Sequence, residues 1–378
     1  MFPVDTLEPP EWIDQAAALA HRVNCLKTVP TIAVDTESNG LHAYREQVCL
    51  IQLSDGQTDS IIDPLAIKDL SPLGPLFADP AIEKVFHASE YDILCLRRDF
   101  GFSFSNIFDT MVASRILGYT AVGLGAMLAA EFDLALDKKY QQANWAKRPL
   151  SRPMLEYART DVHYLPALRD RLKEQLIDNN YLALAQEDFA RLCKVHIKQD
   201  SDHIMDLVWR AAGKQELTPI QAAVLKELVE YREKVAQKIN VPSYKVLSNA
   251  QLLDVTLNNP CDLFEMAENC NLSPVLIERH GEAILKTIKN GLKACPVRRP
   301  CRQKPGVEYL ERLDALRTWR KKTAQGLKVE SDVVLPRDVL EQIAARNPVN
   351  HNELEEMMVE IPWRFQTYGS AILETLQN

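Results

Sequence analysis

The chain has 378 residues, 46% of them hydrophobic and 25% charged, which is enough for one catalytic core and one or two smaller domains. No apolar run reaches the roughly 18 residues that a transmembrane helix needs, and the start MFPVDTLEPPEW lacks the basic and apolar regions of a secretion signal. The eight cysteines include no CxxC pair, which favours reduced thiols over a disulfide framework or a zinc site. We therefore expect a cytoplasmic protein that has no membrane partner.

The net charge of −8 is distributed unevenly along the chain. Residues 35–109 carry 13 acidic and 5 basic side chains. Residues 138–173 carry 3 acidic and 9 basic side chains, and residues 286–328 carry 3 acidic and 13 basic ones. An acidic pocket beside basic stretches suits a metal site that acts on a polyanion. Any one of these stretches alone would indicate only solvated surface charge.

From about residue 30 the pattern predicts alternating strands and helices. Strands are expected at TIAVD (31–35), VCLIQLSDG (48–56), SIIDP (60–64) and KVFH (84–87), with Asp55-Gly56 as a hairpin turn. Helices are expected at SEYDILCLRRDF, at MVASRIL after Asp109-Thr110, and from about Ser151 or Pro153 to about Glu174. This first part of the chain is therefore predicted to be α/β.

Beyond residue 200 the sequence becomes all-helical and repeats itself. Residues 231–260 align with residues 319–348, and residues 281–288 with residues 369–376, at one constant offset of 88. Chance similarity would not hold one register over this length without a gap. Each copy is too long for a solenoid unit, so we predict two homologous helical domains in tandem.

Asp35 and Glu37 are the first candidate metal ligands. They end the first predicted strand, and alternation along a strand points residues i and i+2 to the same side. Acidic-x-acidic is common by chance among 52 acidic residues, but a buried apolar strand seldom ends in two unpaired acids. Two divalent ions that hydrolyse a phosphodiester need several such carboxylates from different parts of a fold.

Two further aspartates are candidates for the next ligand. Asp92 lies early on the helix after the fourth predicted strand, where an acid also complements the helix dipole. Asp109 precedes Thr110 and an apolar helix, a position that favours an N-cap over a metal ligand.

Tyr157 and Asp161 form the third candidate element. Their i, i+4 spacing stacks the phenol and the carboxylate on one face of the last predicted helix, away from its apolar stripe. Asp161 can then bind a metal while Tyr157 orients or deprotonates a water molecule. A tyrosine on a helix is usually a core residue, and the neighbouring Asp161 is what favours the catalytic interpretation.

Together these segments resemble the DEDD exonuclease superfamily, and within it ribonuclease D. Asp35-Thr36-Glu37 is similar to the first motif, Asp92 within HASEYD to the second, and Tyr157 with Asp161 to the third. The tyrosine four residues before the last aspartate makes the third motif similar to that of the tyrosine-type branch of the superfamily.

Two more segments, IDPL (62–65) and LDKKYQQANWAKRPL (136–150), are similar to ribonuclease D. In the second, Lys139 replaces the usual small hydroxyl residue and Asn144 stands where an acid is common. Both departures could alter RNA contacts, but neither affects the candidate metal ligands.

The resemblance implies an α/β fold with a DnaQ-like (ribonuclease H-like) exonuclease domain, whose mixed sheet is flanked by helices, in residues 1–200 (core about 28–195). The tandem repeats resemble the HRDC (helicase-and-ribonuclease-D C-terminal) domain, a small all-α nucleic-acid-binding module. They imply a first HRDC domain in residues 205–293, a basic linker in residues 294–307 and a second HRDC-like domain in residues 308–378.

The resemblance also implies a two-metal-ion 3′→5′ exoribonuclease, in which Asp35, Glu37, Asp92 and Asp161 bind two Mg²⁺ or Mn²⁺ ions and Tyr157 completes the catalytic set. Nucleoside 5′-monophosphates would be released from RNA 3′ ends, tRNA precursors among them, without an obligate protein partner. An exodeoxyribonuclease is the alternative. A non-catalytic RNA-binding protein is disfavoured because all four acids and Tyr157 are present.

Substrate contacts are predicted in several loops and basic segments. The loop after the first motif would pack against the terminal nucleotide, where Tyr44 either stacks on a base or is a half-buried loop aromatic. His87 either contacts the substrate or caps a strand, and the basic side chains would provide generic phosphate affinity. The residues concerned are Leu41, His42, Tyr44, His87, Lys138, Trp145, Arg148, Arg298, Arg299 and Arg302.

Overall fold

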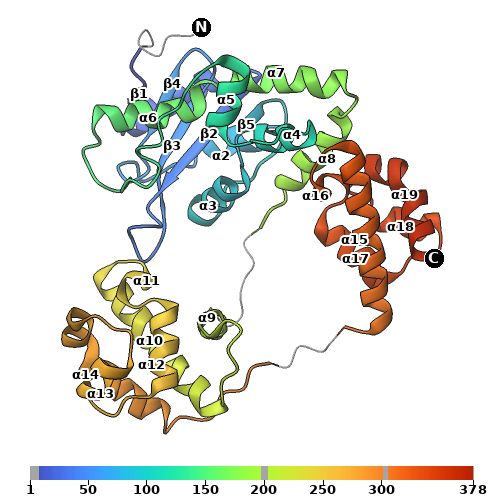
Figure 1. Cartoon of the computed structure of the whole chain (residues 1–378). Coiled ribbons are helices and arrows are strands. Elements are labelled where there is room, and N and C mark those ends of the chain that lie inside the picture. Colours follow the sequence, from blue (N-terminus) through green and yellow to red (C-terminus); the bar gives the residue numbers. More distant parts are fainter. Residues whose placement is uncertain (1–7, 197–202, 301–304, 378) are drawn as a thin grey trace. The chain divides into compact units, whose positions relative to one another are not determined.

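The computed structural model describes residues 8–196, 203–300 and 305–377 (Figure 1). Their contacts divide them into two compact units. Unit 1 holds the described residues of 1–38, 47–197 and 304–378, and unit 2 holds those of 39–46 and 198–303.

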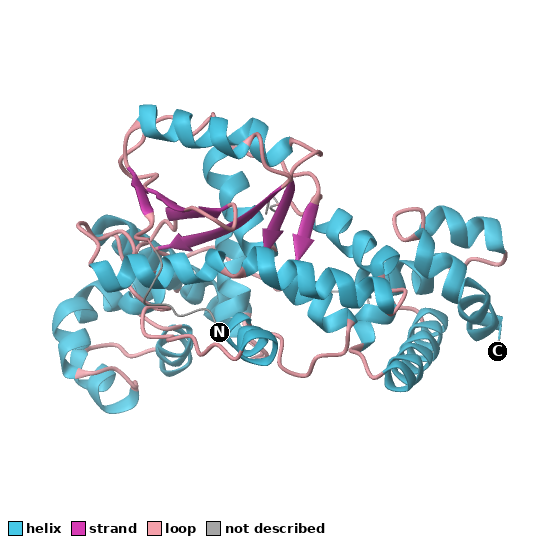
Figure 2. Ribbon diagram, turned by 90° about the horizontal axis from the view of Figure 1, so that it is seen from above, coloured by secondary structure: helices cyan, strands magenta, loops and turns pink. Residues whose placement is uncertain are grey.

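Unit 1 is built on a six-stranded mixed sheet with the strand order β1-β4-β3-β2-β5-β6, drawn in magenta in Figure 2. The pairs β2–β3 and β3–β4 are antiparallel, and the pairs β1–β4, β2–β5 and β5–β6 are parallel. The strands are β1 Glu11–Ile13, β2 Thr31–Ser38, β3 Val48–Ser54, β4 Asp59–Ile62, β5 Glu83–Phe86 and β6 Ile107–Asp109. The mixed sheet was predicted, but its two edge strands, β1 and β6, were not.

The central strands form where the sequence is most apolar. Every residue of β3 is buried, the polar Gln52 and Ser54 included, as expected for a strand covered on both faces. The predicted hairpin turn joins β3 to β4: Gly56 has φ of 84°, which glycine tolerates without strain. Asp55 Oδ1 accepts the N–H groups of Gln57 and Thr58 at 2.9 and 2.8 Å.

Helices cover both faces of the sheet (Figure 2). Those preceding residue 197 are α1 Ala16–Leu26, α2 Leu73–Ala78, α3 Glu90–Phe100, α4 Thr110–Ile116, α5 Leu124–Phe132, α6 Arg152–His163, α7 Leu165–Asp178 and α8 Leu182–Leu192. The prediction of one helix from about Ser151 to about Glu174 was wrong, because the chain breaks at Tyr164 between α6 and α7. Pro166 has no N–H for the carbonyl four residues earlier, which explains the break.

The C-terminal helices also belong to unit 1. They are α15 Val307–Leu327, α16 Ser331–Val334, α17 Arg337–Arg346, α18 His351–Met357 and α19 Pro362–Gln377. Arg364 of α19 is fully buried, and its guanidinium donates to Glu187 Oε2 and Asp188 Oδ2 of α8, both at 2.9 Å. It also donates to the Val333 carbonyl at 2.9 Å. This buried ion pair attaches the C-terminal helices to α8.

Unit 2 is a helical bundle with its own apolar core. Its helices are α9 His203–Ala212, α10 Pro219–Ile239, α11 Ser243–Val246, α12 Asn249–Asn258, α13 Leu263–Asn269 and α14 Pro274–Gly291. A Cβ atom at Gly291 would lie 2.5 Å from Val224 Cα, so α14 and α10 approach too closely there for any larger residue.

The two sets of C-terminal helices confirm the sequence repeat. Each helix from α10 to α14 begins 88 residues before its counterpart among α15 to α19. Arg232 donates to the Leu247 carbonyl, and its equivalent Arg320 donates to the Leu335 carbonyl. Asn240 and Lys328, which end the two long helices, both have left-handed backbone conformations. The repeat therefore preserves the fold down to individual caps and hydrogen bonds.

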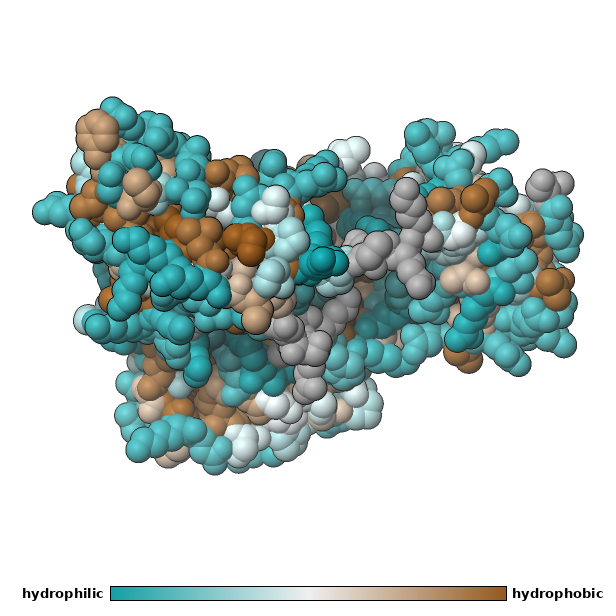
Figure 3. Space-filling model, turned by 90° about the horizontal axis from the view of Figure 1, so that it is seen from below, coloured by the Kyte–Doolittle hydropathy of each residue, from teal (hydrophilic) through white to brown (hydrophobic). Residues whose placement is uncertain are grey.

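Among the described residues, no helix is both long and apolar enough to cross a membrane. The face drawn in Figure 3 carries mainly hydrophilic residues, with apolar residues in patches between them. The seven described cysteines are all free.

Candidate active site

Strand β2 positions two of the candidate ligands near the middle of the sheet, between β3 and β5. Asp35 lies opposite Gln52 of β3, and Glu37 lies opposite Leu50. The register shifts between Glu37 and Ser38, so regular pairing ends just after the second acid. Both carboxylates are half-buried and lie on the same side of the strand, as the alternation predicted.

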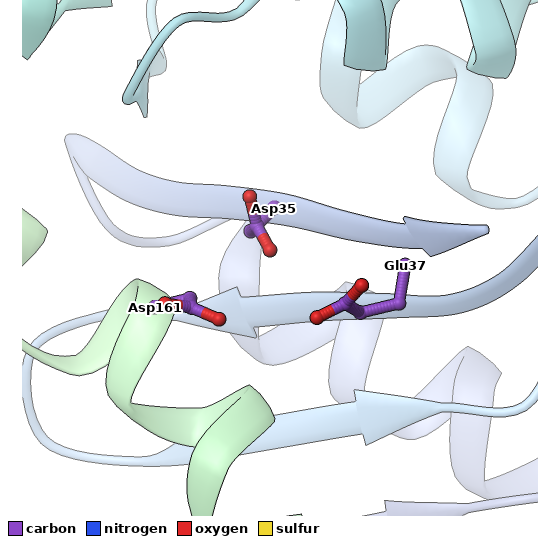
Figure 4. A group of neighbouring side chains, drawn as sticks. All are labelled: Asp35, Glu37 and Asp161. Atoms are coloured by element: carbon purple, nitrogen blue, oxygen red, sulfur yellow. The ribbon is translucent and has the colours of Figure 1, made fainter. Parts of the chain in front are cut away.

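Helix α6 adds a third carboxylate to this pair. It packs on β2, β3 and β4 through the buried side chains of Ala158 and Val162, which leaves Asp161 facing the sheet's acids. One oxygen each of Asp35, Glu37 and Asp161 lies within 4.8 Å of the others, and Figure 4 shows the three carboxylates directed toward a common space. We call these three residues the acidic cluster.

Asp92 of α3 lies beside the acidic cluster without belonging to the group within 4.8 Å. It is 7% exposed and accepts a short hydrogen bond from the hydroxyl of Thr36, the residue between the two acids of β2. Its negative charge contributes to raising the pKa of Asp35 and of Glu37. The fourth predicted carboxylate is therefore close enough to share an electrostatic environment with the other three.

The carboxyl groups of this site hold protons unusually strongly. Burial, followed by repulsion from Asp92, Asp161 and Glu37, raises the pKa of Asp35 well above its ordinary value. Burial and the charges of Asp161 and Asp92 raise the pKa of Glu37 to about 9. Burial also raises the pKa of Asp92 and of Asp161 to about 7 each. A bound cation would reverse these shifts, and an all-carboxylate set of oxygens is the donor type that hard divalent ions prefer.

Tyr157 lies one helical turn before Asp161. Its ring centroid is 6.0 Å from those of both Trp145 and Tyr140. Burial, and then the charges of Asp161, Glu37 and Asp35, raise its pKa. The phenol therefore keeps its proton at neutral pH and can donate a hydrogen bond toward the acidic cluster.

Asp109 is the N-cap of α4, as its sequence position favoured. Its carboxylate accepts the N–H groups of Met111 and Val112 at 2.9 and 3.1 Å. It also accepts those of Ala88 and Ser89, at 3.2 and 2.7 Å, just before α3 begins. One carboxylate thus fixes the starts of two helices, a second function that its sequence position did not reveal.

Trp145 does not contact the surface, which corrects its predicted contact with substrate. It is 1% exposed and belongs to a small apolar core with Leu50, Ile61 and Ala158, against which Tyr157 packs. Trp145 therefore packs against the Tyr157 side chain from the apolar core.

The prediction that Arg148 binds phosphate or a base also requires correction. Its guanidinium donates two hydrogen bonds to the Asp63 carboxylate, each with a nitrogen–oxygen distance of 2.7 Å. The other three N–H groups donate to the carbonyls of Trp145, Lys147 and Cys49. All five donors of the guanidinium are used, so Arg148 connects the segment around Trp145 to the sheet.

His87 and Lys138 differ in their surroundings. His87 is half-buried, its Nδ1 lies 2.9 Å from the Thr110 hydroxyl, and burial lowers its pKa, so it is neutral at pH 7. This contact with α4 favours the structural alternative for His87. Lys138 is exposed, and its contact with substrate stays a prediction.

The loop after the first motif, Asn39–Glu46, belongs to unit 2. Lys245 donates to the Leu41 carbonyl at 2.7 Å, and Asn240 Oδ1 accepts the Tyr44 N–H at 3.2 Å. The half-buried Tyr44 ring packs against the core of unit 2, which is the second of the two predicted alternatives. The contacts of Leu41, His42 and Tyr44 with a nucleotide stay predictions.

The basic residues predicted between the repeats are only partly described. Arg298 is exposed. Arg299 lies over the Trp209 ring, 5.4 Å from its centroid, and donates to the Gly213 carbonyl at 2.9 Å. Arg302 lies outside the described residues.

Comparisons with known proteins match three separate segments of the chain. A family model for 3′–5′ exonucleases matches residues 10–177, and the HRDC domain model matches residues 221–288 and 310–376. The first match begins one residue before β1, a strand that was not predicted from the sequence.

Similar proteins are found among curated proteins and solved structures. The chain is 35% identical over 314 residues to the exosome complex component 10 homolog of Caenorhabditis elegans, covering 81% of this chain but only 35% of that protein. It is 30% identical over 301 residues to ribonuclease D of Acidiphilium cryptum, covering 78% and 75% of the two chains. The crystal structure of Escherichia coli ribonuclease D matches with a TM-score of 0.71 and 25% identity, covering 98% of this chain and 99% of that one.

Proposed function

Since the chain belongs to the ribonuclease D family of 3′–5′ exonucleases, we propose that it is an exoribonuclease that removes nucleotides from RNA 3′ ends as nucleoside 5′-monophosphates. The observation that carries this proposal is the meeting of Asp35, Glu37 and Asp161 within 4.8 Å, from two separate elements, beside the buried Asp92. Uncompensated buried charges are costly, so such a set is expected where a cation binds.

Two Mg²⁺ or Mn²⁺ ions are the proposed cofactors, and oxygens of Asp35, Glu37, Asp92 and Asp161 are the proposed ligands. The raised pKa values of the four acids support this assignment: burial is the main cause in each, repulsion by neighbouring acids of the site adds to it for Asp35, Glu37 and Asp161, and a bound cation would offset both effects. Divalent ions at such a site supply an activated water and neutralise charge on the phosphate and the leaving oxygen.

Tyr157 is proposed to orient the attacking water. Its raised pKa keeps the phenol protonated at neutral pH, so it acts as a hydrogen-bond donor, not as the base that removes a proton. The Trp145 and Tyr140 rings flank its side chain and hold the hydroxyl in place. A fixed donor of this kind lowers the cost of positioning the water.

RNAs with structured 3′ ends, tRNA precursors among them, are the proposed substrates. The Escherichia coli relative is described as an exoribonuclease involved in structured RNA processing. The 13 basic and 3 acidic side chains of residues 286–328 support generic affinity for a phosphate backbone, and the two HRDC repeats support nucleic-acid binding.

RNA labelled at its 3′ or its 5′ end and incubated with Mg²⁺ tests the proposal. Labelled mononucleotide should appear first from the 3′-labelled strand, and the 5′-labelled strand should shorten stepwise. Asp35→Asn should abolish turnover and keep RNA binding, whereas Asp178→Asn, an exposed acid of α7, should change neither. Internal cleavage, or activity that survives chelation, would contradict the proposal. Equal hydrolysis of a 2′-deoxy 3′ end would favour the exodeoxyribonuclease alternative.

A further inference from the structure

A cavity of about 550 Å³ adjoins Tyr157 on unit 1. Its walls come from residues 135–140 and from the first turns of α6, and they include Leu136, Tyr140, Pro153 and Tyr157. We call it the Tyr140 cavity. Its volume falls in the range of roughly 300–1,000 Å³ that is typical of small-ligand sites.

Two cations line this cavity without internal partners. Among the described residues, neither the Lys139 ammonium nor the Arg152 guanidinium has a hydrogen-bonded or ion-paired partner, and both side chains are exposed. The wall also holds two acids: Glu156 pairs with Arg159 at 2.5 Å, and Asp137 Oδ1 accepts the backbone N–H of Lys139 at 2.9 Å. With Glu156 paired to Arg159, the two cations outnumber the one remaining acid, Asp137, so the wall keeps a net positive charge for an anion.

The aromatic wall suits a flat ring. The Tyr140 ring stands edge-on to Tyr157, with the ring centroids 6.0 Å apart and the ring planes 71° apart. The Lys139 ammonium lies 5.5 Å from the centroid of the Tyr140 ring, so an aromatic ring and a cation lie next to each other in the cavity wall. Aromatic rings beside unpaired cations are the combination with which proteins hold single-stranded nucleotides.

We propose that the Tyr140 cavity binds one nucleotide unit, with the base against the Tyr140 ring and the phosphate between Lys139 and Arg152. This inference rests on the proposed exoribonuclease activity, which offers two sources of such a unit. One is a nucleotide of the RNA strand next to the scissile bond, and the other is the released nucleoside 5′-monophosphate. Tyr157 forms one wall, so either unit would lie beside the tyrosine proposed to orient the water.

The test uses the full chain and two kinds of variant. Tyr140→Leu removes the ring, and the double variant Lys139→Ala with Arg152→Ala removes both cations. Lys147→Ala is the matched control, an exposed lysine of the same region that does not line the cavity. The two replaced cations are exposed, so the double variant should fold even if Tyr140→Leu does not.

Two measurements distinguish the sources. The first is calorimetric titration with AMP in a chelator, and the second is the KM and kcat for single-stranded RNA in Mg²⁺. AMP affinity about tenfold weaker with KM unchanged would identify the released nucleotide, since one stacked base or phosphate contact accounts for a loss of this size. In the double variant, KM about tenfold higher with kcat nearly unchanged would identify a nucleotide of the strand. Tyr140→Leu is judged by its AMP affinity alone, because the Tyr140 ring also flanks Tyr157.

Unchanged AMP affinity in both kinds of variant and unchanged KM in the double variant, relative to Lys147→Ala, would overturn the nucleotide site. A wild-type chain that binds AMP through these residues but does not shorten RNA would keep the site and contradict the exoribonuclease proposal. The two proposals therefore fail separately.

Discussion

Glu37→Gln should reveal the protons that the metal-free acidic cluster holds. In the folded chain the pKa of Glu37 is raised from 4.5 to about 9, whereas in the unfolded chain it returns to its ordinary value. Between these values the folded state keeps a proton that the unfolded state has lost. Its contribution to stability is fully present below pH 4.5 and is lost as the pH rises through about 9.

The size of the effect follows from one proton. The free energy of unfolding of the metal-free wild type should fall by about 1.4 kcal/mol per pH unit on account of Glu37 alone. Glutamine has nearly the same shape and carries no ionisable proton, so Glu37→Gln should lack this decline. The variant should gain about 3 kcal/mol over the wild type when the pH is raised from about 5.5 to about 7.5.

Urea unfolding in a chelator, repeated across this pH range, measures the difference. Glu174→Gln, which changes an exposed glutamate of α7, is the control and should run parallel to the wild type. Added Mg²⁺ should stabilise the wild type more than Glu37→Gln, because a ligand that binds only the folded state raises its stability. Parallel curves for the wild type and Glu37→Gln, or a metal-free wild type that grows more stable with rising pH, would refute the proposed proton uptake.

Three further changes test other parts of the structure. Tyr157→Phe should lower kcat by roughly 10² or more with little effect on RNA affinity, and equal single-turnover rates would remove the proposed role of the hydroxyl. Arg364→Met leaves Glu187 buried without its cation and should lower the free energy of unfolding of the C-terminal helices by about 3–5 kcal/mol. Residues 305–377 should then be cleaved faster in limited proteolysis, and an unchanged cleavage rate would contradict the buried ion pair. Asp109→Ala should lower the free energy of unfolding in urea by roughly 2 kcal/mol or more, because four backbone N–H groups lose their acceptor. A smaller loss would mean that water replaces the carboxylate as acceptor.

Local periodicity was sufficient to pair the acids of β2 and to pair Tyr157 with Asp161, whereas Asp92 was assigned through its resemblance to the second motif. Asp35 and Glu37 share a side because a strand alternates, and Tyr157 stands over Asp161 because a helix turns every 3.6 residues. The N-cap at Asp109 was predicted for the same reason, since a cap depends on its immediate neighbours. These relationships need no knowledge of distant contacts.

What the sequence could not predict depends on pairing between distant segments. Strand β1 has three residues and exists because it pairs with β4, some 49 residues later. Lys84 is fully buried in β5, with its ammonium on the carbonyls of Asp79 and Ile82, although lysine is among the residues least often buried. No local pattern distinguishes such a lysine from one at the surface.

Arg148 shows why a basic residue near a candidate nuclease site cannot be assigned to phosphate from sequence alone. Arginine binds a carboxylate and a phosphate with the same planar pair of N–H groups, so its residue type fits both functions equally. In the structure, Arg148 binds the carboxylate of Asp63. Asp63 lies in the IDPL segment, and Arg148 lies in the RPL segment. The two segments that resemble ribonuclease D outside its acidic motifs are therefore partners in one ion pair.

That ion pair has a consequence for the proposed active site. Arg148 also donates to the Trp145 carbonyl, and Trp145 packs behind the Tyr157 ring. The Asp63 carboxylate thus connects through Arg148 and Trp145 to the tyrosine that is proposed to orient the water. Lys139 and Arg152, in contrast, have no such internal partners among the described residues. Beside Tyr157 the unpaired cations are therefore the ones proposed to hold a phosphate, whereas the paired Arg148 is expected to affect the reaction through the position of the phenol.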